Sequence, residues 1–188
     1  MKRGLVAALA LAGAAPATPG IDGFRGGHVR SPDGRWTVSA VAADPDRTMR
    51  TTAWLQGPGV QHRPLTRFER YLDVRWLRDI GKVMLVERTT HFARIALRTL
   101  GPRETGPRDR VQADIEQGLA GLSRLGTIEN RRIAFGTLGR DTCVLAEESG
   151  LPPGRAEGSF IARRAAFRLD LAAGRAIRIR ACPNATID

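Results

Sequence analysis

The chain is dominated by short segments in which apolar and polar residues alternate, each ended by Gly, Pro or Asp. Alternation places the apolar side chains on one face of an extended strand, and the turn residues bring the next strand back beside it. Three pairs of segments fit this pattern and predict β-hairpins: 36–41 with 51–56, 132–137 with 142–147, and 160–171 with 176–182. A chain of this kind folds mostly as antiparallel sheet.

The middle of the chain is less regular. Residues 65–77 fit both a helix face and an alternating strand, and we favour a strand in the second half. Residues 82–87 form a nearly continuous apolar run, which is typical of a central strand covered on both faces. Residues 91–100 alternate as a strand does, although Thr90 and Gly101 would equally frame a helix.

One segment has clear helical periodicity. Its apolar residues recur every three or four positions and would form a single stripe: Val111, Ile115, Leu119 and Leu122. Pro107 suits the first helical position, and Gly126 lies beyond the end. We therefore expect an α+β fold, with a mostly antiparallel sheet of β-hairpins and one main amphipathic helix, at about 107–122, packed on it.

The first residues have the pattern of a secretory leader. Two basic residues precede a short apolar run over residues 5–15, and Ala-Pro-Ala then supplies the small residues of a cleavage site. The run is too short to cross a bilayer. We expect residues 1–17 to be a signal peptide cleaved between Ala17 and Thr18, with export to a periplasm or the medium and no integral membrane span.

The remainder of the 188-residue chain has the usual size of one domain. Residues 18–32 are rich in Gly and Pro and are expected to form a flexible lead-in, followed by a single α+β domain over residues 33–188. Two cysteines, Cys143 and Cys182, follow the leader. Because an oxidising compartment favours their joining, we predict one disulfide that ties the C-terminal segment to the core.

The chain is strongly basic, with 30 Lys and Arg against 19 Asp and Glu. A basic surface attracts anionic polymers through its summed positive potential. Arg178 and Arg180 share a strand face, and Arg168 would join them if it lay on the opposing strand, so we predict an anion-binding face there. The alternative is that these arginines extend into water while their stems cover apolar residues.

Catalytic and cofactor motifs are not found. The histidines His28, His62 and His91 lie far apart and lack the spacing of a helical zinc site, so no metal is expected. Nucleophile elbows, phosphate-binding loops and dinucleotide-binding turns are also missing, so we predict no catalytic residue and no cofactor. Glu147 and Glu148 would point to opposite faces of a strand and are interpreted as edge or turn charges.

These features predict a small exported, non-enzymatic protein that binds an anionic envelope polymer or another envelope protein, without a specific nucleic-acid motif. One alternative is a hydrolase with scattered residues, using His91 or the acidic residues within 141–148, which requires a polar pocket. Another is a structural or chaperone-like accessory protein whose partner covers an exposed strand edge. The sequence does not indicate the oligomeric state.

Overall fold

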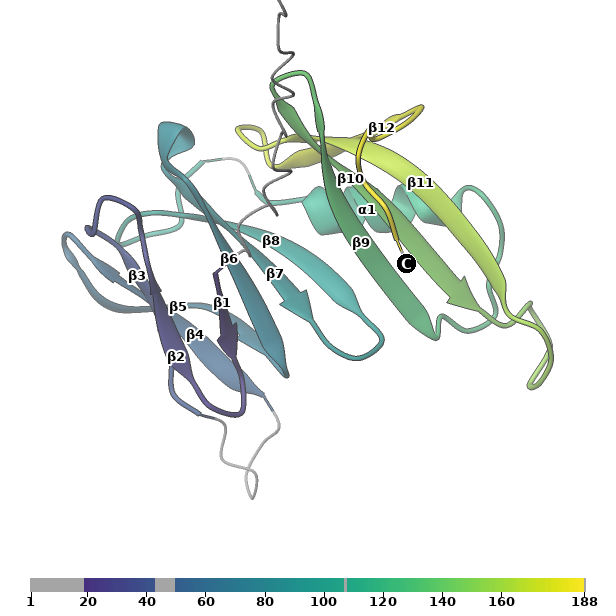
Figure 1. The fold of residues 1–188 in the computed structure, drawn as a ribbon, viewed down its shortest axis with the longest axis horizontal. Coiled ribbons are helices and arrows are strands. Elements are labelled where there is room, and N and C mark those ends of the chain that lie inside the picture. Colours follow the sequence, from purple (N-terminus) through teal and green to yellow (C-terminus); the bar gives the residue numbers. More distant parts are fainter. Residues whose placement is uncertain (1–18, 43–49, 107, 188) are drawn as a thin grey trace, which may run out of the picture.

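The computed structural model describes residues 19–42, 50–106 and 108–187, and it contains three four-stranded antiparallel sheets and one α-helix in these ranges (Figure 1). This confirms the α+β class with hairpin sheets and a single main helix. The leader, its cleavage site between Ala17 and Thr18, and the expected helix start at Pro107 lie outside the described residues. None of the helices in the described ranges has the length and apolar character needed to cross a membrane.

The central sheet has the strand order β1-β6-β7-β8. Its strands are β1 (Gly20–Asp22), β6 (Tyr71–Leu77), β7 (Lys82–Arg88) and β8 (Ala93–Thr99). A short 3₁₀ turn (Arg78–Ile80) joins β6 to β7. Both ambiguous segments of the middle region are therefore strands.

The N-terminal sheet has the order β2-β3-β4-β5. It consists of β2 (Gly27–Arg30), β3 (Thr37–Ala40), β4 (Thr51–Gly57) and β5 (Val60–Phe68). The pairing of β3 with β4 confirms the first predicted hairpin. Strand β5 escaped prediction because its register against β4 shifts beside Pro64, and such a bulge interrupts the alternation of side chains.

The C-terminal sheet has the order β12-β11-β10-β9. It is built from β9 (Asn130–Leu138), β10 (Asp141–Gly150), β11 (Ile161–Asp170) and β12 (Arg175–Ile179). The pairings of β9 with β10 and of β11 with β12 confirm the other two predicted hairpins. A disulfide joins Cys143 on β10 to Cys182 after β12, as predicted.

The helix α1 (Val111–Ala120) contacts the C-terminal sheet and β8. Val111, Ile115 and Leu119 are fully buried, which confirms three members of the predicted apolar stripe. The helix is shorter than predicted: it ends at Ala120, and Leu122, the fourth member, lies beyond it with 38% of its surface exposed.

Two hydrophobic cores meet at the central sheet. Val83 and Leu85 of β7 pack into a core shared with the N-terminal sheet, and Met84 and Val86 pack into a core shared with α1 and the C-terminal sheet. Since successive side chains of a strand point to opposite faces, both faces of β7 are buried. The prediction of a central strand covered on both sides is confirmed.

The expected flexible lead-in contains two strands. Residues 20–30 form β1 and β2. Ile21 is 1% exposed because it packs in the core between the central and N-terminal sheets. The many Gly residues of this segment made it resemble a loop, but its strands are stabilised by pairing with distant parts of the chain, as β1 is by β6. The division of the chain into a leader and one domain stays a prediction.

Candidate functional site

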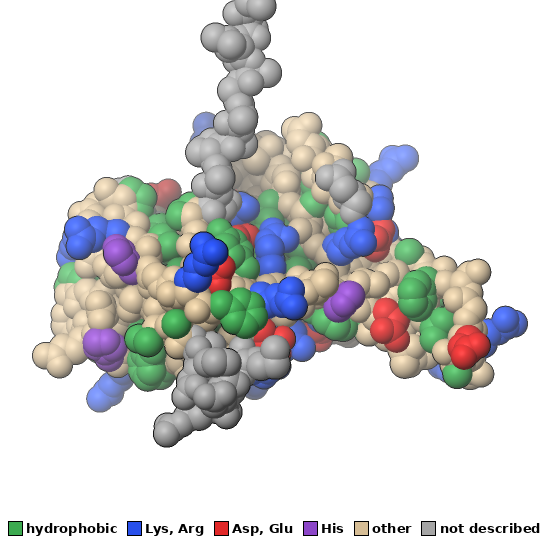
Figure 2. Space-filling view, turned by 60° about the horizontal axis from the view of Figure 1, so that its bottom comes forward, with side chains coloured by type: hydrophobic (Ala, Val, Ile, Leu, Met, Phe, Trp, Pro, Cys, Tyr) green, Lys and Arg blue, Asp and Glu red, His purple; other side chains and the backbone are tan. Residues whose placement is uncertain are grey.

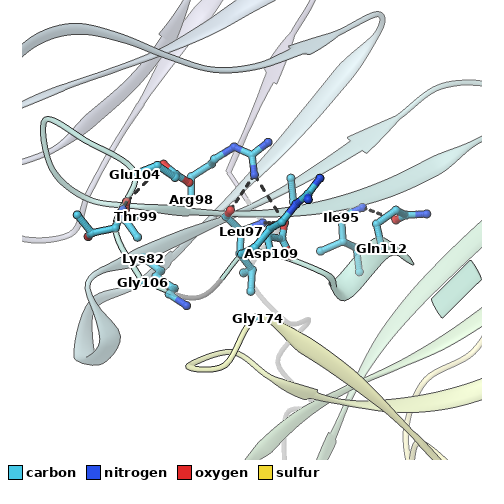
Figure 3. A pocket seen from close by; sticks show the side chains of 13 residues that line it. Lys82, Ile95, Leu97, Arg98, Thr99, Glu104, Gly106, Asp109, Gln112 and Gly174 are labelled. Atoms are coloured by element: carbon cyan, nitrogen blue, oxygen red, sulfur yellow. Dashed lines mark hydrogen bonds and ion pairs between the residues drawn. The ribbon is translucent and has the colours of Figure 1, made fainter. Parts of the chain in front are cut away.

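A cavity with convergent polar groups lies beside β8. It has a volume of about 470 Å³ and is bounded by β8, by the loop that joins β8 to α1 (described for residues 101–106 and 108–110), by the start of α1 and by Gly174 of the turn between β11 and β12 (Figure 3). The central sheet, the segment that carries the helix and the C-terminal sheet therefore meet at this place. A cavity of this size is within the range that holds small ligands.

Side chains rather than a strand cover the outer edge of β8. The Ile95 N–H donates to Gln112 Oε1 at 2.9 Å, and the Leu97 N–H donates to Asp109 Oδ2 at 2.7 Å (Figure 3). An edge strand otherwise leaves such groups unpaired. The two side chains replace a neighbouring strand and hold the 101–110 loop and α1 against the central sheet, which shapes the cavity.

Lys82 supplies a buried positive charge to this cavity. The residue stands at the start of β7 and is 8% exposed. Its Nζ donates to Leu171 O at 3.0 Å and to Ala172 O at 2.7 Å, and the third ammonium hydrogen has no partner among the residues that the structure describes. No ion pair joins Lys82 to a carboxylate within the described ranges. Burying a charge without an opposite charge is costly, so an anion in the cavity would be stabilised.

The two carboxylates that line the cavity are already engaged. Glu104 Oε2 lies 2.5 Å from Arg63 Nη1, and Asp109 Oδ2 lies 3.6 Å from Arg98 Nη1. Arg108 also lines the cavity and is exposed. The lining therefore offers the Lys82 ammonium and the exposed Arg108 guanidinium beside carboxylates that are already paired, which suits a ligand with a carboxylate or phosphate group.

The predicted anion-binding face of Arg168, Arg178 and Arg180 is not assembled. Arg168 lies opposite Ile177 in the pairing of β11 with β12, whereas Arg178 lies opposite Phe167. Because residues directly opposite each other share a face, Arg168 and Arg178 lie on different faces of the sheet. Arg180 follows the end of β12. Anion binding by any one of these residues stays a prediction.

Most of the arginines within residues 163–180, the C-terminal set, are neutralised within the fold. Four of the six form ion pairs: Arg163 with Glu148, Arg164 with Glu147, Arg168 with Asp141 and Arg175 with Asp114. Arg178 and Arg180 are exposed. Figure 2 shows basic side chains spread over one face of the molecule with acidic ones between them, rather than gathered in a single patch.

A buried charge cluster lies between the C-terminal sheet and α1. Glu148, interpreted from the sequence as an edge or turn charge, is 1% exposed on β10, so that interpretation is wrong. It lies directly opposite Arg131 on β9 and Arg163 on β11. Its two carboxylate oxygens accept from Arg131 Nε at 2.7 Å and from Arg163 Nε at 2.9 Å. Because successive residues of β10 point to opposite faces of the sheet and α1 packs on one of them, one of two successive glutamates faces the interior.

His91, the histidine of the hydrolase alternative, is exposed, and its Nδ1 lies 2.9 Å from Asn130 Oδ1. The neighbouring pocket of about 230 Å³ is lined by Thr89, Thr90 and Thr186 among others, and its described lining contains no acidic residue. A histidine base needs an orienting partner and a positioned nucleophile: Asn130 can orient His91, but the residues described around this pocket include no carboxylate. Across the described ranges, no three His, Cys, Asp or Glu side chains come together as a metal site requires.

Comparison with known proteins finds no match: no family model fits the chain, and no curated protein or solved structure is significantly similar to it. The function is therefore argued from the cavity and its residues.

Proposed function

We propose that this protein is an exported, non-enzymatic binding protein that holds the acidic group of an envelope component in the cavity beside Lys82. The observation that carries the proposal is the buried Lys82 ammonium, which has two carbonyl partners and a remaining hydrogen at a cavity of about 470 Å³. Export is supported by the disulfide, since such bonds persist in oxidising compartments.

The ligand class follows from the charges. A carboxylate or a phosphate would accept the free Lys82 hydrogen and compensate the buried charge. Its uncharged part would lie along the 101–110 loop, where Thr105 and Gly106 line the cavity. A neutral ligand would leave the charge uncompensated and gains nothing from this site.

The test is calorimetric titration of the protein with glucose 6-phosphate and with glucuronate, using glucose as the neutral control. We expect at least one of the acids to bind and glucose not to bind. Tighter binding of glucose 6-phosphate indicates a phosphate site, and tighter binding of glucuronate indicates a carboxylate site. The Lys82→Met variant keeps the apolar stem but removes the charge, and we expect it to lose binding by tenfold or more.

The matched control is the double variant R178A/R180A, which removes the two exposed arginines of the C-terminal set. We expect its affinity to equal that of the unaltered protein. Loss of binding in this control with retention in the Lys82→Met variant would move the site to the C-terminal arginines and refute the cavity proposal. Equal binding of glucose would also refute it.

A further inference from the structure

One face of the N-terminal sheet points away from the central sheet, and no helix or strand of the described ranges packs on it. Along β3 and β4, Val38 and Leu55 are fully buried in the core, so the residues between them in the alternation point outward. Strand pairing aligns four of the outward residues in one row across the sheet: His28, Ser39, Trp54 and Pro64. We call the face centred on this row the Trp54 face.

Trp54 is held in place within this face. The His62 ring meets it edge-on, with ring centres 5.9 Å apart and planes inclined by 66°. His62 Nε2 in turn lies 2.9 Å from Gln56 Nε2. The exposed part of this half-buried indole offers an apolar surface flanked by hydrogen-bonding groups, and its contact with His62 lowers the side-chain entropy that is lost when a ligand binds.

The four strands of this sheet are free of acidic residues. Between them β2, β3, β4 and β5 contain no Asp or Glu, in a chain that has 19 of them. Arg30 and Arg67 are exposed at the two sides of the sheet, on β2 and β5, and neither forms an ion pair within the described part of the chain. The strands that form the Trp54 face therefore contribute only positive formal charge to it, which favours an anionic partner.

We propose that the Trp54 face binds an acidic polysaccharide. The apolar face of a sugar ring would stack on the indole of Trp54, and the sugar hydroxyls would bond to Gln56 and Ser39. The carboxylates of neighbouring sugar units would lie near Arg30 and Arg67. A sheet face that spans four strands offers contacts to a run of sugar units rather than to a single small molecule, and none of its residues named here lines the cavity beside Lys82.

The test is affinity electrophoresis and calorimetry of the full chain with polygalacturonate, with dextran as the neutral polysaccharide and a DNA duplex as the non-saccharide polyanion. We expect polygalacturonate to bind, with an affinity that falls as salt rises, and dextran to bind at least tenfold more weakly. Equal binding of the DNA duplex would show that charge alone acts, and would overturn the saccharide assignment.

Two variants locate the site. Trp54→Ala removes the stacking surface and is expected to weaken polygalacturonate binding tenfold or more. Because Trp54 is half-buried, replacing it also removes packing within the fold. Arg67→Glu is therefore the second variant: it changes an exposed residue of the same face and should weaken binding at low salt. The Lys82→Met variant should bind polygalacturonate unchanged, which separates this proposal from the cavity. Unchanged binding in both Trp54→Ala and Arg67→Glu would contradict the proposal.

Discussion

Among the buried charged residues of the described ranges, Glu148 is the least exposed, at 1%. Its carboxylate lies between two guanidinium groups that are themselves buried, those of Arg131 and Arg163, each 8% exposed. Glu147, its neighbour, pairs with Arg164, whose side chain is 50% exposed. One pair of glutamates thus contains a buried and a surface interaction on opposite faces of the same strand.

Glu148→Gln should destabilise the protein by about 3–5 kcal/mol, because it leaves the buried Arg163 guanidinium without a counter-charge and leaves Arg131 with only the partly exposed Glu116. Glu147→Gln is the matched control and should cost no more than about 1 kcal/mol, as is usual for surface ion pairs. The free energies of unfolding in urea measure both. Equal losses in the two variants would show that the buried cluster has no special role.

Asp114 gives the fold a dependence on acid. Burial by itself raises the pKa of Asp114, but hydrogen bonds from Arg175 and from the Ala176 N–H outweigh burial and hold the pKa below its ordinary value. A lowered pKa in the folded state contributes stability that is present above the ordinary Asp pKa of about 4. That stability is lost as the pH falls through the folded-state pKa.

Asp114→Asn should therefore be less stable than the unaltered protein at pH 7, and the difference should shrink as the pH falls below about 4. Urea unfolding at a series of pH values measures it. A difference that stays constant down to the acid limit would show that the Asp114 charge does not stabilise the fold.

The disulfide between Cys143 and Cys182 was predicted from the sequence, but the cavity beside Lys82 was not. Lys82 was visible as one of only two lysines, with Lys2, in an arginine-rich chain. Its burial was not visible, because it depends on the turn after β11, 89 residues away from it in sequence. Glu148 was hidden for the same reason, since its two arginines come from neighbouring strands.

At the scale of elements, regular alternation decided what could be predicted. The hairpins β9-β10 and β11-β12 follow from alternation closed by a turn, and each turn contains a glycine with positive φ, Gly139 at 63° and Gly174 at 66°. Strand β1 has three residues, too few for a pattern, and β5 is interrupted by a bulge. The end of α1 was misplaced because Leu122 continues the apolar periodicity beyond the helix.

The packing of α1 on β11 depends on the lack of a side chain at Gly118. A Cβ built at this position would lie 2.5 Å from the Phe167 ring. Gly118→Ala should therefore destabilise the protein by about 1–3 kcal/mol through overpacking, despite the better helix propensity of alanine. Urea unfolding measures the change.

Gly121 is the control for this prediction, because it follows the same helix with a helical φ of −70° and its Cβ would approach nothing closer than 3.8 Å. Gly121→Ala should change the stability by no more than about 1 kcal/mol. A stabilising effect of Gly118→Ala would show that the helix does not lie against Phe167 as described.

At the scale of the whole molecule, the central sheet connects two cores and the disulfide closes the chain end. Cys143 and Cys182 are separated by 39 residues and are both buried. A loop of this length corresponds to about 4 kcal/mol in the chain-entropy treatment. Replacing both cysteines by alanine should lower the free energy of unfolding by about 2–5 kcal/mol. No change in the urea midpoint would show that the C-terminal segment is held without the bond.

The central claim is that the buried Lys82 ammonium binds an anionic ligand. Since Lys2 is the only other lysine, a Lys2→Arg variant of the full chain has a single lysine ammonium, which can be observed by ¹⁵N nuclear magnetic resonance. Titration with the acid that binds by calorimetry, glucose 6-phosphate or glucuronate, should shift this one resonance, with the same dissociation constant as the calorimetric titration. A resonance that stays in place while the protein is saturated with ligand would contradict the claim.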